Sequence, residues 1–250
     1  MTATRTSTRL LVAVGLLALT AGACSSDSDT KTTTAVTTPA TVPAGETTVA
    51  SETTVGGDTS TSVNGFTGAL TGMFGIDAGA CDGTAVTGSY FRMMQPDKNF
   101  IPNADSSCAD TTYSLLAAGT DGGLQAGEFQ AAPDPAFDAT GSGLADKIVM
   151  PVKFFGVNFA VATDPTGTAP TITESNGLLV GDLSAFTAYY GTGVFNQGAP
   201  KPDGSGDAAM GTIDASTGHF IIEWTSLISG GSFDGFTGVW HLEGTFTPAG

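Results

Sequence analysis

The chain has 250 residues, enough for one large domain or two small ones, and it is acidic and rich in glycine. It contains 24 Asp and Glu but only 8 Lys and Arg, which gives a formal net charge of −16. So few basic side chains cannot neutralise a row of phosphates or hold the protein on an anionic lipid surface. The charge balance therefore argues against nucleic-acid binding and against electrostatic docking on a membrane.

Residues 1–23 have the pattern of a signal peptide. Arg5 and Arg9 precede residues 10–23, a run of 14 apolar or small residues that ends directly before Cys24. The run is too short for a membrane-spanning helix but typical of the apolar region of a secretory leader. This pattern predicts cleavage after Ala23 and an extracytoplasmic protein.

Residues 21–24, Ala-Gly-Ala-Cys, resemble the lipobox at which bacterial lipoproteins are cleaved and diacylated on cysteine. Ala21 departs from the family pattern, which prefers Leu three residues before the cysteine. The resemblance implies a protein anchored to the cell membrane through lipid on Cys24. The alternative is plain secretion, which would leave Cys24 as a free thiol.

Residues 24–63 are predicted to be a disordered linker. Residues 25–62 contain 13 Thr, together with Ala, Val, Pro and Ser, and no aromatic residue. Such a segment cannot bury enough apolar surface to offset the cost of ordering the chain. It would act as a stalk, either O-glycosylated or unmodified. The leader, Cys24 and this stalk together resemble actinobacterial envelope lipoproteins, which implies a location but no chemistry.

The remaining cysteines, Cys81 and Cys108, form an even pair if Cys24 carries lipid. In an oxidising compartment they are expected to form a disulfide. Closing that loop should stabilise the fold by about 3.5 kcal/mol in the chain-entropy model.

Residues 64–250 are predicted to form one all-β domain. Short apolar runs are interrupted at close intervals by Gly, Asp, Asn, Ser and Pro, and no long helical period is visible. We expect a single antiparallel β-sandwich, with a closed β-barrel as the alternative.

Three stretches of this domain allow more specific predictions. Residues 112–118 and 124–130 flank a glycine-rich turn at 119–123, which predicts a hairpin. Residues 152–162 are predicted to be a strand with Phe155, Val157, Phe159 and Val161 on one face. Residues 178–190 are interpreted as one long strand or, from the spacing of their aromatics, a short helix.

The last sixty residues predict a three-stranded meander over residues 208–213, 219–228 and 236–246. Pairing the last two strands about the middle of their glycine-rich link places Trp224 opposite Trp240. A slip by one residue would turn every apolar side chain outward, so this register is strongly favoured.

The same register suggests one chemical site, on the outer face of the meander. His241 would lie opposite Glu223, with Glu243 two residues along and His219 on the same face. A carboxylate beside an imidazole can serve general acid–base catalysis or bind a metal. The alternative is an ordinary cross-strand pair that contributes less than about 1 kcal/mol.

A second candidate is a calcium site built from hard oxygen donors within the disulfide loop: Asp97, Asn99, Asn103, Asp105 and Asp110. Their spacing matches no known calcium loop, and Asp and Asn also populate turns because they bond to their own backbone.

Three functions fit these patterns. The first is a non-catalytic module that binds a ligand or a partner, such as cell-wall polysaccharide or another envelope protein. Candidate sugar platforms are Tyr90, Tyr189, Tyr190 and Phe195. The second is a hydrolase of envelope polymer that uses Glu223, His241 and Glu243. The third is a purely structural surface protein.

Overall fold

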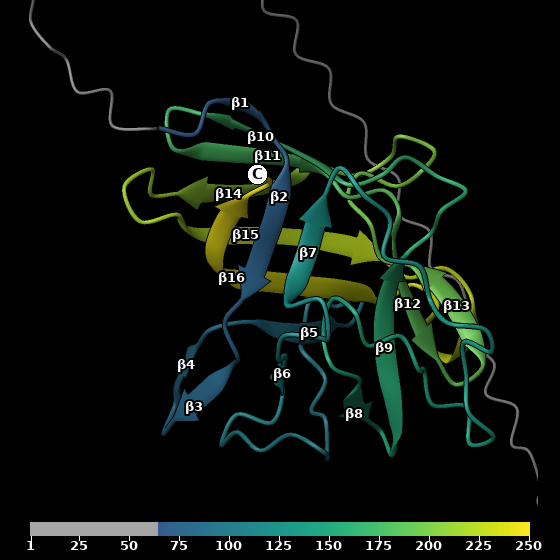
Figure 1. The fold of residues 1–250 in the computed structure, drawn as a ribbon. Helices are drawn as coiled ribbons and strands as arrows, with labels where there is room; N and C mark the ends of the chain where they lie inside the picture. Colours follow the sequence, from purple (N-terminus) through teal and green to yellow (C-terminus); the bar gives the residue numbers. More distant parts are fainter. Residues whose placement is uncertain (1–64) are drawn as a thin grey trace, which may run out of the picture. The chain divides into compact units, whose positions relative to one another are not determined.

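The computed structural model describes residues 65–250 (Figure 1). Cys24 and the predicted leader and linker lie outside the described residues. Within residues 65–250 every regular element is a β-strand, apart from the short 3-10 turn η1 (Gly231–Phe233), and all strand pairs are antiparallel. The prediction of an antiparallel all-β domain is confirmed. No helix in this part of the chain is long and apolar enough to cross a membrane.

The largest sheet has ten strands and curls back toward its own beginning. Its main path runs in the order β1 (Gly68–Leu70), β10 (Thr171–Ser175), β11 (Leu178–Asp182), β14 (Ala209–Ile213), β15 (His219–Leu227), β16 (Thr237–Pro248), β2 (Gly72–Ile76) and β7 (Gly123–Ala126). Only Thr71 separates β1 from β2, yet they pair with opposite ends of this path. The sheet is therefore nearly closed and barrel-like, the alternative that the sequence left open.

The remaining strands lie outside this main path. β5 (Tyr90–Met94) pairs with the first half of β16 and with β6 (Ser114–Leu115). A four-stranded sheet has the order β13 (Gly193–Asn196), β12 (Phe186–Tyr190), β9 (Val157–Thr163) and β8 (Val152–Phe154). A small hairpin joins β3 (Ala80–Asp82) to β4 (Ala85–Thr87).

The C-terminal meander forms as its alternating pattern predicts. Trp224 lies opposite Trp240 and Ile222 opposite Leu242, which confirms the predicted register. The two indoles stack, with ring centroids 5.7 Å apart, and the Phe186 ring from the four-stranded sheet makes a T-shaped contact with each. One continuous core therefore joins the two sheets.

The predicted hairpin around residues 119–123 is wrong. The turn is present, with Gly122 and Gly123 at positive φ, but the segments beside it do not pair with each other. β6 pairs with β5, whereas β7 pairs with β2. Each flank has a longer partner elsewhere in the large sheet, and those partners override the local turn signal.

Two other stretches are each divided into two strands. In residues 152–162, Phe155 and Gly156 form a two-residue turn between β8 and β9, so Phe155 is exposed instead of sharing a face with Phe159. Residues 178–190 form β11 and β12, which belong to different sheets. The alternating pattern continued through both breaks, which is why it predicted single strands.

Cys81 and Cys108 form the predicted disulfide, with their Cα atoms 5.6 Å apart. The bond ties β3 to the long loop that precedes β6.

Candidate ligand site

The outer face of β15 and β16 brings together the predicted carboxylate–imidazole cluster. His241 Nδ1 lies 2.8 Å from Glu223 Oε1, and His241 Nε2 lies 3.6 Å from Glu243 Oε2. His219 joins the cluster, because its Nε2 lies 3.1 Å from Glu243 Oε1. The residues thus sit where strand register placed them.

Neighbouring residues already stack on this cluster or donate hydrogen bonds to it. The ring of Tyr90 stacks on His241 at 4.5 Å, and the backbone N–H of Gly88 donates to Glu243. Burial, followed by the charge of Glu223, raises the pKa of Tyr90. The Glu223 side chain is 62% exposed, and none of the three hollows characterised in residues 65–250 is lined by the cluster. No group of three His, Cys, Asp or Glu in the described chain is placed to hold a metal ion.

The candidate calcium ligands serve the loop backbone instead of converging on one point. Asp97 accepts from the N–H of Asn99, and Asp110 accepts from the N–H of Thr112. These hydrogen bonds hold the pKa of both carboxyls below the usual range. Buried Asn103 accepts from the N–H of Asp105, whose own carboxylate accepts from Gly156. This is the turn-forming role that the sequence also allowed.

The aromatic residues considered as sugar platforms lie in different environments. Tyr90 belongs to the outer face, and Tyr189 packs against Phe137. Tyr190 and Phe195, in contrast, line a hollow between the two sheets. The four do not form a single platform.

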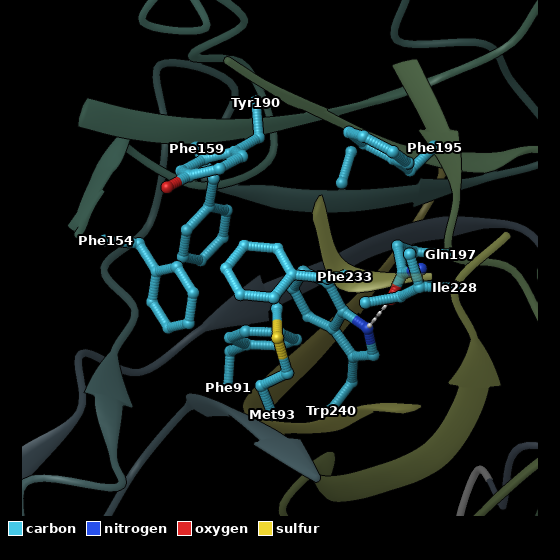
Figure 2. Close-up of a pocket in the computed structure, with 11 residues that line it drawn as sticks. Phe91, Met93, Phe154, Phe159, Tyr190, Phe195, Gln197, Ile228, Phe233 and Trp240 are labelled. Atoms are coloured by element: carbon cyan, nitrogen blue, oxygen red, sulfur yellow. Dashed lines mark hydrogen bonds between the residues drawn. The ribbon is translucent and has the colours of Figure 1, made fainter. Parts of the chain in front are cut away.

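That hollow is an aromatic cavity of about 40 Å³ between the four-stranded sheet and the β5–β16 part of the large sheet (Figure 2). Its wall is almost entirely apolar and is formed by Phe91, Met93, Phe154, Phe159, Ala188, Tyr190, Phe195, Gln197, Ile228, Phe233 and Trp240. Seven of these residues carry aromatic rings. We refer to this space as the aromatic cavity.

Two polar side chains line the cavity, those of Gln197 and Tyr190, and Gln197 already makes hydrogen bonds to both tryptophans. Gln197 accepts the indole N–H of Trp240 through its side-chain oxygen, at 3.2 Å, and that of Trp224 through its backbone oxygen, at 2.8 Å. Burial, followed by the charge of Asp105, raises the pKa of the Tyr190 phenol above its usual range. The cavity therefore presents rings and methyl groups, and little else, to an occupant.

Phe233 projects among the other rings from the loop that joins β15 to β16 (Figure 2). Its ring centroid lies 5.9 Å from those of both Phe154 and Tyr190. The loop has Gly230, Gly231 and Gly235 at positive φ. A Cβ on Gly231 would lie 2.9 Å from the Phe195 ring, so this close approach requires glycine.

Sequence reasoning did not identify the aromatic cavity. Its rings come from segments far apart in the chain, and most alternate as ordinary core residues do. One signal was present: Phe233 is the only large apolar residue in the glycine-rich stretch 229–235.

The chain matches no protein-family model, and comparison with curated proteins and with solved structures likewise found no match.

Proposed function

We propose that this chain is a lipid-anchored extracytoplasmic module whose β-domain binds a small apolar ligand, without catalysis, in the aromatic cavity. The observation that carries the proposal is the aromatic cavity with Phe233 seated in it. Ligand sites are concave, mostly apolar and aromatic, and this hollow has that character.

Size explains why Phe233 matters. A space of about 40 Å³ admits a few waters but no organic molecule, whereas a cavity of about 150 Å³ is known to bind benzene. The Phe233 ring is itself benzene-sized. Its withdrawal would therefore open room for a ring or a short alkyl chain among the six remaining aromatic side chains.

The loop is built so that it can withdraw as a unit. The hydrogen bonds that residues 229–235 make within the described structure all stay inside residues 228–236, including Gly230 N–H to Asp234 and Gly235 N–H to Ile228. Moving the loop outward would cost ring contacts but no hydrogen bond to the sheets. An apolar ligand would replace those ring contacts.

Binding is tested with 1-octanol and toluene as probes. Trp240 lines the cavity and is one of only two tryptophans, so its fluorescence reports occupancy directly. The wild type should show saturable binding and a higher melting temperature with probe. Phe233→Ala should bind more tightly, whereas Phe129→Ala, at an exposed site, should not differ from wild type. If Phe233→Ala binds the probes and the wild type does not, Phe233 is an ordinary core residue and the proposal is wrong.

Anchorage is a separate part of the proposal and rests on residues 1–24. Mass spectrometry of the protein from its native membrane should find a mature amino terminus at Cys24 carrying diacylglycerol. Cys24→Ala should not be acylated and should leave the membrane fraction. An unacylated amino terminus in the wild type would contradict this part and leave ligand binding untouched.

A further inference from the structure

A cleft of about 480 Å³, lined by both polar and apolar residues, shares a lining residue with the aromatic cavity. Phe195 lines both, with Asn196, Lys201, Asp203, Ser205 and Leu227 among the other residues of the cleft. A smaller hollow of about 220 Å³ shares Lys201, Ser205 and Leu227 with it. The two hollows are therefore neighbours at Phe195, and the cleft adds polar side chains that the aromatic cavity lacks.

Lys201 is the only basic residue that lines any of these three hollows in the described chain. Its Nζ donates to the backbone oxygen of Asn196, at 2.7 Å, in the residue that follows Phe195. An ammonium has three donors, and this is the one hydrogen bond that the structure gives it within residues 65–250. Burial lowers the pKa of Lys201, while nearby Asp203 opposes that shift.

We propose that the ligand is an amphiphile with one carboxylate, whose apolar tail occupies the aromatic cavity and whose head group binds Lys201 in the cleft. This inference rests on the proposed function and names the class of its ligand. A molecule that reaches both hollows beside Phe195 would place its two ends in these two environments.

The cleft also limits the charge of the head group. Asp203 lines the same space and accepts from the N–H of Ser205, and hydrogen bonds from Ser205 lower the pKa of the Asp203 carboxyl. A single negative charge on the ligand meets one ammonium, but a second would meet the Asp203 carboxylate without a partner. A carboxylate therefore fits better than a doubly charged phosphate.

Octanoate and 1-octanol share a tail and differ in the head group. Comparing them therefore separates binding of the apolar tail from binding of the carboxylate. Binding to the full chain is followed by tryptophan fluorescence at pH 7. Octanoate should bind the wild type about ten-fold more tightly than 1-octanol, because a charge-assisted hydrogen bond is added. Lys201→Met should lose that advantage and keep its affinity for 1-octanol within about two-fold. Lys147→Met, at an exposed site elsewhere, should behave as the wild type does.

The carboxylate assignment is wrong if the wild type binds the two probes equally, or if Lys201→Met still prefers octanoate. Neither result contradicts the apolar site. Binding of neither probe would remove the proposed function together with this inference. Octyl phosphate provides the third arm, and binding tighter than that of octanoate would contradict the charge limit set by Asp203.

Discussion

At the scale of single residues, Gln197 is the polar group on which both core tryptophans depend. It is 2% exposed and accepts both indole N–H groups. A buried donor left without an acceptor costs about 1–3 kcal/mol, which is more than the hydrogen bond contributes when both partners are present.

Gln197→Leu is therefore expected to lower the free energy of unfolding by about 1–3 kcal/mol. Urea denaturation followed by tryptophan fluorescence measures this loss. Trp240→Phe removes the donor, so the double variant should lose less than the sum of the two single variants. Strictly additive losses would show that the side chains of Gln197 and Trp240 do not act as a pair.

The outer-face cluster allows a second prediction at this scale. Successive strand residues point to opposite faces, so His241 lies on the other side of β16 from Trp240 and the aromatic cavity. Glu223→Gln should change stability by less than about 1 kcal/mol, because the Glu223 side chain is 62% exposed. Octanol binding should also be unchanged.

An assay of the same variant on cell-wall polymer addresses the hydrolase alternative. Hydrolysis by the wild type that is lost in both Glu223→Gln and His241→Ala would favour that alternative over a binding module.

At the scale of elements, the strand Gly72–Ile76 meets β16 at a point where no side chain fits. A Cβ on Gly244 would lie 1.8 Å from the carbonyl oxygen of Gly75. Gly244→Ala should force the strands apart and destabilise the fold by at least about 1–3 kcal/mol. Gly167→Ala, in an exposed loop with ordinary contacts, should change stability by less than about 0.5 kcal/mol. Thermal unfolding of both variants makes the comparison.

The β15–β16 hairpin shows how much of the fold the sequence can predict. β15 and β16 are neighbours in the chain, and their two-residue alternation leaves one register that buries both tryptophans. The register then placed His241 beside Glu223 correctly. The other edge of β16 pairs with β5 and β2, more than 140 residues earlier, and no local pattern encodes that choice.

The aromatic cavity was unpredictable for the same reason. It forms only where β5 and β16 of one sheet face β9 and β12 of the other. Phe159 and Phe91 alternate as any core residue would, so nothing in their own segments distinguishes a cavity wall from a filled core. The failed hairpin at 119–123 shows the converse, a strong local signal overridden by distant partners.

At the scale of the whole molecule, acidic side chains organise many of the loops. Within residues 65–250, seven aspartates accept the backbone N–H of the residue two positions on, and in five of them the pKa of the carboxyl is lowered: Asp97, Asp110, Asp138, Asp203 and Asp214. Hydrogen bonds from that residue hold the pKa of each of these five carboxyls below its usual value. These carboxyls stabilise the folded state more when they are ionised than when they are protonated.

The pH dependence of stability follows from the sign of those shifts. A group with a lowered pKa in the folded state stabilises the fold at pH above its unfolded pKa, near 3.9, and loses that contribution as the pH falls through the folded pKa. Between pH 7 and pH 5 the aspartates stay ionised, so the melting temperature should not fall. It should drop steeply below about pH 4. Asp138→Asn keeps an acceptor oxygen for Thr140 and Ser142 but cannot titrate, so its decline should be shallower than that of the wild type. Thermal unfolding of the wild type and of Asp138→Asn from pH 7 to pH 2 measures both declines. If the two melting temperatures fall equally below pH 4, the Asp138 turn contributes nothing to acid sensitivity.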